Sequence, residues 1–115
     1  MLVVTRHRVP PEGVAAFVVG AEHALAALAA RPGWVEGTLG RNVDDPGLWV
    51  LSTRWADVGS YRRALSAYEV KVSAVPLLST AVDEPSAYEV VLGRGGDGTS
   101  SHAPDAAIAG PGAER

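Results

Sequence analysis

One histidine, His7, occupies a position from which a side chain could act as a general base inside a folded domain. In the segment Leu2–Val9 it falls on the same side as Val3 and Thr5, while the arginines between them point the other way. Imidazole titrates near neutral pH, so an interior His7 could take a phenolic proton from a bound aromatic substrate. The electron-rich anion left behind could then reduce dioxygen without a cofactor. The alternative is a histidine that is hydrogen-bonded inside the sheet or exposed near its edge.

Aromatic residues offer a second kind of chemistry, because they can stack on a planar ligand and donate phenolic hydrogen bonds. We expect four of them to line a substrate-binding pocket: Trp34, Trp55, Tyr61 and Tyr68. Trp55 ends a predicted strand and Tyr68 lies near a possible helix break, and both are places where a pocket could open. Core packing is the competing interpretation for Tyr61 and Tyr68, and core or interface packing is the simpler one for Trp49.

Motifs for other chemistries are missing from the sequence. The three histidines fall on separate predicted elements with no metal-ligand spacing between them, and cysteine is absent, so we expect no metal site and no cofactor. The glycine-rich residues 93–96 are followed by no predicted helix, so they have linker composition and do not form a phosphate-binding loop. A net charge of -3 argues against nucleic acid as a partner.

The composition predicts one globular domain with a tail. The chain has 115 residues, of which 47% are hydrophobic and 20% charged, which is enough for a single core. Glu22 and His23 interrupt the apolar stretch Val14–Ala30, so we expect no leader and no membrane span, and the cytoplasm is the default compartment. Small and polar side chains dominate residues 94–115, which predicts a flexible tail after a folded domain of residues 1–93.

Hydrophobic periodicity and turn residues then predict the elements that must position these side chains. In order, they are a strand over Leu2–Val9, a helix over Glu12–Ala30, strands over Trp34–Val43 and Leu48–Trp55, a helix from Asp57 to Pro76 and a strand over Ser86–Leu92. The second helix has a possible break near Ser66-Ala67, and one face is predicted to be buried: Val58, Tyr61, Leu65, Tyr68, Val72 and Val75. The βαββαβ order is the ferredoxin-like arrangement of an α+β fold, with both helices on one face of a four-stranded antiparallel sheet.

The other face of that sheet has no cover within the chain. Its simplest cover is the same face of a second copy, so burial predicts a symmetric homodimer. By alternation along its strand, Arg54 lies on this face. There a salt bridge between subunits is a simpler role for it than contact with an anionic substrate.

Four sequence segments carry a family resemblance: MLVVTRHRV, RPGWVEGTLGRNV, LWVLSTRWADVGSYRRAL and SAYEVVL. Their order and spacing over Met1–Leu92 resemble the antibiotic biosynthesis monooxygenase family of dimeric α+β barrel proteins. The resemblance implies two sheets closed face to face into a barrel, with a small, largely apolar pocket under the helices of each subunit. The family includes cofactor-independent oxygenases of polyphenolic polyketides, quinol oxygenases and haem-degrading enzymes.

The resemblance implies a cofactor-independent monooxygenase acting on a small aromatic, polyphenolic or quinol-like substrate. The alternation along the first strand makes His7 the candidate base. In the haem-degrading branch, the resemblance implies Asn, Trp and an axial His at the positions that hold His7, Ala64 and Ala74 in this sequence. The main anchor for haem is therefore missing unless His7 or Tyr68 replaces it. A non-catalytic ligand-binding or accessory dimer would need the same pocket without a proton-transferring group. A polyketide cyclase or isomerase would use the pocket without consuming oxygen.

Overall fold

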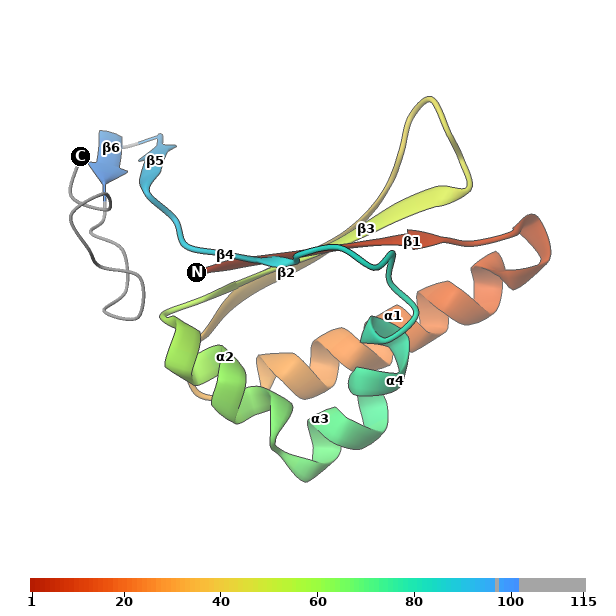
Figure 1. Ribbon diagram of the computed structural model, residues 1–115, viewed down its shortest axis with the longest axis horizontal. Helices are drawn as coiled ribbons and strands as arrows, with labels where there is room; N and C mark the ends of the chain where they lie inside the picture. Colours follow the sequence, from red (N-terminus) through yellow and green to blue (C-terminus); the bar gives the residue numbers. More distant parts are fainter. Residues whose placement is uncertain (97, 102–115) are drawn as a thin grey trace.

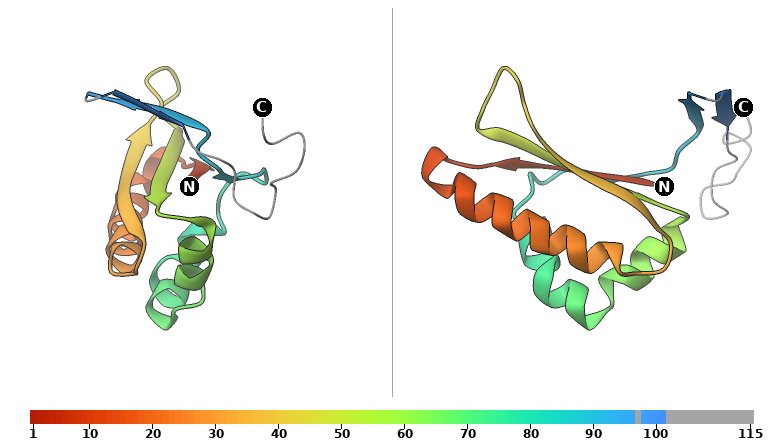
Figure 2. Two further views of the ribbon diagram at one scale, coloured as in Figure 1. Left: turned by 90° about the vertical axis from the view of Figure 1, so that its left-hand side faces the viewer. Right: turned by 180° about the vertical axis from the view of Figure 1, so that it is seen from behind.

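The computed structural model describes residues 1–96 and 98–101 and shows an antiparallel sheet with helices on one face (Figure 1). The elements are β1 (Leu2–Arg8), the single 3-10 turn η1 (Pro11–Gly13), α1 (Val14–Ala29), β2 (Trp34–Arg41), β3 (Leu48–Trp55), α2 (Val58–Leu65), α3 (Tyr68–Ser73), α4 (Val75–Leu78), β4 (Ala87–Tyr88), β5 (Leu92–Gly95) and β6 (Gly98–Ser101). The strand order β2-β3-β1-β4 is the ferredoxin-like one, which confirms the predicted α+β fold. Figure 2 shows the α-helices on one side of this sheet.

Alternation along β1 divides its side chains between the two faces of the sheet. Val3, Thr5 and His7 are buried under the helices, whereas Arg6 is exposed on the open face. His7 lies opposite Trp49 in the register with β3, and Trp49 is also buried. The helix-facing sides of the two central strands therefore form one buried surface, and His7 points inward as its alternation predicts.

Small side chains allow the helices to approach each other and the sheet closely. The core cluster consists of Val3, Ala24, Leu28, Trp55, Ala64, Val70 and Ala74. Gly33 forms the turn between α1 and β2 with a φ of 90°, and a Cβ at this position would overlap the side chain of Ser60. Glycine is required there, and the turn places Trp34 at the start of β2 against Trp55, with ring centroids 5.4 Å apart.

The second helical region breaks where the sequence predicts it, and the break changes which residues are buried. α2 begins at the Asp57 cap, whose carboxylate accepts a 2.7 Å hydrogen bond from the backbone N–H of Ser60. Ala67 has extended backbone angles, so the chain leaves α2 and starts a new helix, α3, at Tyr68. The predicted stripe is wrong beyond this point, because Tyr68 is 75% exposed and Val70 takes the buried position instead. The other two residues of the stripe, Val72 and Val75, are exposed as well.

The first helix is the most apolar segment of the chain. Residues Pro11–Ala29 are long and apolar enough to cross a membrane by length and composition alone, with a mean hydropathy of 1.4. The core helix of a globular domain can meet the same criteria. In this fold α1 packs against β2 and α3, and Ala21, Ala24 and Leu28 form its fully buried face.

The last strand is shorter than predicted. Only Ala87 and Tyr88 pair with β1, opposite Val3 and Leu2, whereas the sequence predicts a strand over Ser86–Leu92. Beyond it, β5 and β6 form a separate two-stranded sheet in the segment where linker and tail composition begin. The predicted boundary at residue 93 falls within β5, and residues 102–115 of the predicted tail lie outside the described residues.

Candidate active-site cleft

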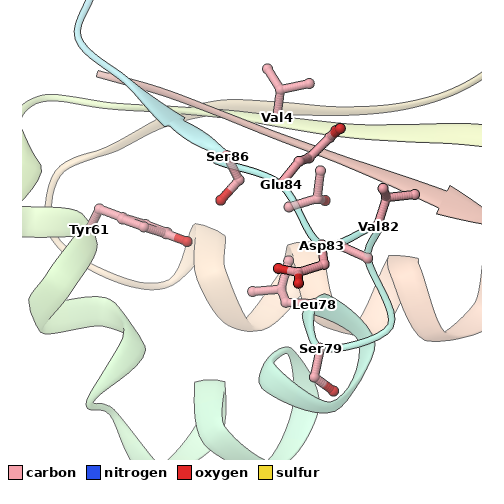
Figure 3. Close-up of a pocket in the computed structure, with 10 residues that line it drawn as sticks. Val4, Tyr61, Leu78, Ser79, Val82, Asp83, Glu84 and Ser86 are labelled. Atoms are coloured by element: carbon pink, nitrogen blue, oxygen red, sulfur yellow. The ribbon is translucent and has the colours of Figure 1, made fainter.

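An open cleft of about 360 Å³ lies where the helices meet the free part of the β1 edge (Figure 3). Its walls come from β1, α2, α4 and the segment that leads into β4, and its lining residues are Val4, Thr5, Tyr61, Leu78, Ser79, Ala81, Val82, Asp83, Glu84 and Ser86. The rim therefore carries hydroxyls and carboxylates around a smaller apolar floor. The family resemblance implies a largely apolar pocket, and this cleft is more polar than that.

The segment of residues 79–86, here called the strap, is fixed along β1 by backbone and side-chain contacts. The Val82 N–H donates to the Arg6 carbonyl and the Val4 N–H donates to the Ser86 carbonyl, both at 2.7 Å. Arg6 also donates two hydrogen bonds, of 2.7 and 2.6 Å, to the carboxylate of Glu84. These hydrogen bonds, with the charge of Arg6, hold the pKa of Glu84 below its usual range. The cleft therefore has a wall that is tied to the sheet.

His7 lies directly behind this cleft. Its side chain is 1% exposed, and it is not among the residues that line the cleft. Nε2 lies 2.9 Å from the Thr5 hydroxyl, and Nδ1 lies 3.1 Å from the Thr80 hydroxyl on the strap. The imidazole also packs against Phe17, with ring centroids 5.3 Å apart. Thr5 is therefore both a lining residue of the cleft and a hydrogen-bond partner of the buried imidazole.

Burial lowers the pKa of His7 from its ordinary value near 6.5, so the imidazole is neutral at pH 7. A neutral imidazole has one nitrogen free to accept a proton, which is the form that a base requires. Sequence reasoning identified His7 through its alternation in β1. Thr5 and Thr80 were missed as site residues, because isolated threonines form no recognisable motif.

Three of the four predicted aromatic residues come together, but only one of them lines the cleft. Trp34, Trp55 and Tyr61 form a chain of ring contacts, with centroids 5.4 and 5.6 Å apart. Trp55 is 2% exposed and its Nε1 donates to the Thr53 hydroxyl at 3.0 Å, so it is a core residue that supports the site from behind. Tyr68 does not join them, because it lies on the exposed side of α3.

Tyr61 supplies the phenol of the cleft. Figure 3 shows its hydroxyl directed into the cleft, toward Leu78 and Asp83. Burial raises the pKa of Tyr61, so its hydroxyl carries a proton at neutral pH. That hydroxyl makes no hydrogen bond to any residue in the described part of the chain, which leaves it available to a guest.

The space behind Tyr61 is filled. The region bounded by Val3, Thr5, Leu28, Leu51, Thr53, Tyr61 and Leu78 leaves a volume of about 0 Å³ for a water-sized guest. A guest in the cleft would therefore have Thr5 and Tyr61 among its neighbours and would have no room to enter the core behind them. The positions corresponding to the tryptophan and axial histidine of haem-degrading relatives, Ala64 and Ala74, are buried in the core and have no donor atoms.

The lowered pKa of His7 predicts a pH-dependent stability. Between the folded pKa and the unfolded value near 6.5, the unfolded chain binds more protons than the folded one. The free energy of unfolding should therefore fall as the pH drops below 6.5, by at most about 1.4 kcal/mol per pH unit, and this loss should stop below the folded pKa. Urea unfolding of wild type and His7→Gln from neutral to mildly acidic pH would measure it. An equally steep decline in both proteins would contradict the assignment to His7.

A protein-family model for antibiotic biosynthesis monooxygenases matches residues 1–73, which is more than half of the chain. The chain belongs to the antibiotic biosynthesis monooxygenase family. The match covers β1 to α3, and so includes His7, Thr5, Tyr61 and the three tryptophans. The strap and Thr80 lie beyond it. A search of the curated proteins finds no match.

Solved structures of the antibiotic biosynthesis monooxygenase fold resemble the chain. A variant of SnoaB, a cofactor-independent oxygenase from Streptomyces nogalater, is 28% identical with a TM-score of 0.62, over 70% of this chain and 82% of that one. A conserved protein from Methanosarcina mazei Go1 is 22% identical with a TM-score of 0.62, over 75% and 84%. A family protein from Nitrosomonas europaea is 14% identical with a TM-score of 0.60, over 75% and 82%. The last two support the fold alone.

Proposed function

We propose that this family member is a cofactor-independent monooxygenase that oxidises a small aromatic, polyphenolic or quinol-like substrate in the cleft beside Tyr61. The observation that carries the proposal is the position of Thr5, which is a lining residue of the cleft and whose hydroxyl lies 2.9 Å from Nε2 of a buried neutral histidine. This arrangement can remove a proton from a guest that His7 itself does not reach. The likeness to SnoaB, which is a cofactor-independent oxygenase, supports the same reaction class.

The reaction follows from the order of these groups. A substrate with an acidic C–H beside a phenolic ring gives its proton to Thr5 Oγ1, while the Thr5 proton moves to His7 Nε2. The Tyr61 hydroxyl donates a hydrogen bond to the oxygen over which the negative charge spreads. The carbanion reduces dioxygen and combines with it to form a peroxide, which takes back the proton from His7. Loss of water then converts the original CH₂ to a carbonyl, so one oxygen atom enters the product and the other leaves as water.

The test of this function is oxygen uptake with a panel of hydroquinones and anthrone-like phenols, without added cofactor. Uptake faster than spontaneous oxidation is expected for the wild-type protein, and ¹⁸O₂ should place one labelled atom in the product of an anthrone-like compound. Haem titration run beside it examines the haem-degrading alternative. Rates equal to the protein-free blank for every compound would overturn the proposal.

A non-catalytic ligand-binding or accessory role is the second candidate, and the filled space behind Tyr61 favours it. A guest at the strap would lie in an open cleft and would not be enclosed by protein. Enclosure normally protects a reactive anion from water. Saturable binding of a phenol without oxygen uptake would support this second role. A cyclase or isomerase would instead convert the substrate without consuming oxygen.

We also propose that the working form is a homodimer closed over the open face of the sheet. This face carries the partly buried Leu2, Val4, Leu48 and Val50 beside Arg6, Arg8 and Arg54. In sedimentation experiments, wild type should be a dimer and Val50→Asp should shift toward monomer, because a carboxylate would enter the apolar centre of the contact. Val43→Asp, in the hairpin loop and 94% exposed, is the matched control. A wild-type monomer at micromolar concentration would contradict the dimer.

A further inference from the structure

The hydroxyl of Thr80 has two neighbours whose roles can be assigned by counting protons. It lies 2.7 Å from the carbonyl oxygen of Leu77 and 3.1 Å from Nδ1 of His7. A carbonyl oxygen can only accept, and a hydroxyl has a single proton to donate. The Thr80 proton therefore goes to Leu77, and the Thr80 oxygen must accept from His7. This assigns the imidazole proton to Nδ1.

The other side of the ring agrees with this assignment. A neutral imidazole with its proton on Nδ1 presents a bare lone pair at Nε2. The Thr5 hydroxyl, at 2.9 Å, donates to that lone pair, since its other acceptor, the Leu51 carbonyl, is 3.5 Å away. The protons of Thr5, His7 and Thr80 thus all point in one direction, from the cleft toward Leu77. No carboxylate contacts the ring in the described part of the chain.

Building on the function proposed above, we propose that Thr80 is a positioning residue that fixes His7 in the tautomer whose unprotonated Nε2 faces Thr5 and the cleft. When Nε2 takes up a proton, only the hydrogen bond between Thr5 and His7 changes direction. The imidazolium then donates from both nitrogens, and Thr80 remains the acceptor at Nδ1. Thr80 belongs to the strap, so the segment that forms the wall of the cleft also sets the proton pattern of the base behind it.

Removing the Thr80 hydroxyl should reverse this pattern. In Thr80→Val the Nδ1–H would be buried without an acceptor, which is costly. The proton would move to Nε2 and be donated to Thr5, whose own proton would turn to the Leu51 carbonyl. The base would then present a proton to the cleft in place of a lone pair. Thr80→Ser keeps the hydroxyl and should keep the wild-type tautomer.

The experiment is long-range ¹H–¹⁵N NMR of histidine-labelled protein above the pKa of His7, with the His7→Gln spectrum assigning the signals. We expect the proton on Nδ1 in wild type and Thr80→Ser, and on Nε2 in Thr80→Val. Ser79→Ala is the matched control on the strap, because that hydroxyl donates to the Pro76 carbonyl and makes no contact with His7. A proton on Nε2 in wild type, or an unchanged tautomer in Thr80→Val, would overturn the proposal. The wild-type spectrum alone decides the assignment if Thr80→Val does not fold.

Kinetics separate this proposal from the function on which it rests. With a substrate from the oxygen-uptake panel, Thr80→Val should lower kcat by about 10-fold with little change in KM, and Thr80→Ser should restore it. Turnover that persists unchanged in a Thr80→Val protein with a reversed tautomer would exclude Thr80 from the reaction. An Nδ1–H tautomer in a protein with no oxygenase activity would instead refute the proposed function and leave the proton assignment standing.

Discussion

His7→Gln is expected to lower kcat for oxygen consumption by about 100- to 10,000-fold, the usual contribution of a positioned general base. Glutamine can keep hydrogen bonds to the neighbouring threonines, but it cannot take up a proton near neutral pH. KM should change little, because His7 does not line the cleft. In wild type the rate should also fall as the pH drops through the lowered pKa of His7, and this acidic limb should disappear in the variant.

Two substitutions of Thr5 test the same relay. Thr5→Val removes the hydroxyl that links His7 to the cleft with little change in volume, so its loss of kcat should approach that of His7→Gln. Thr5→Ser retains the hydroxyl and should retain most of the turnover. If His7→Gln retains full activity, His7 is not the base and the relay through Thr5 does not operate.

Trp55→Ala should destabilise the fold by about 3 to 5 kcal/mol, the usual cost of emptying a buried aromatic site. Trp55 is 2% exposed, packs edge-on against Trp34 and contacts Tyr61. Its loss would open a cavity behind the cleft and leave the Thr53 hydroxyl without its indole donor. Urea unfolding followed by circular dichroism would measure the change.

Tyr68→Ala is the control for this second prediction. Both residues were expected to line the pocket from sequence, but Tyr68 is largely in solvent. Its removal should change the free energy of unfolding by no more than about 0.5 kcal/mol. Similar losses in the two variants would mean that Trp55 is not the core residue described here.

Local patterns were sufficient to predict most of the framework. The strand Leu48–Trp55 has the predicted bounds, because the Asp44–Gly47 turn and the Asp57 cap fix its two ends. The inward orientation of His7 follows from the two-residue period of a strand, which is insensitive to tertiary context. The break near Ser66-Ala67 was also predictable, but not its effect. Once α3 starts on a new axis, the stripe of α2 no longer predicts which side chains are buried.

The missing parts of the site depend on contacts between residues distant in sequence. Thr80 is 73 positions from His7, and the strap has no helical or strand periodicity from which its path could be predicted. The length of β4 also depends on contacts between residues that are distant in sequence. The alternation in Ser86–Leu92 predicts a full strand. Only Ala87 and Tyr88, near its start, pair with β1, where Val3 and Leu2 are the partners. Pairing partners of this kind are not contained in a local pattern.

The two margins of the four-stranded sheet have a consequence for how copies of the chain can assemble. At the outer margin of β2, a bulge between Trp34 and Glu36 interrupts the row of backbone donors and acceptors. At the opposite margin, the strap already uses the Val4 N–H and the Arg6 carbonyl. Both features disfavour the addition of a further strand where they occur, at the start of β2 and along the part of β1 that the strap covers. A face-to-face dimer of the kind proposed above would use neither edge and would close on itself.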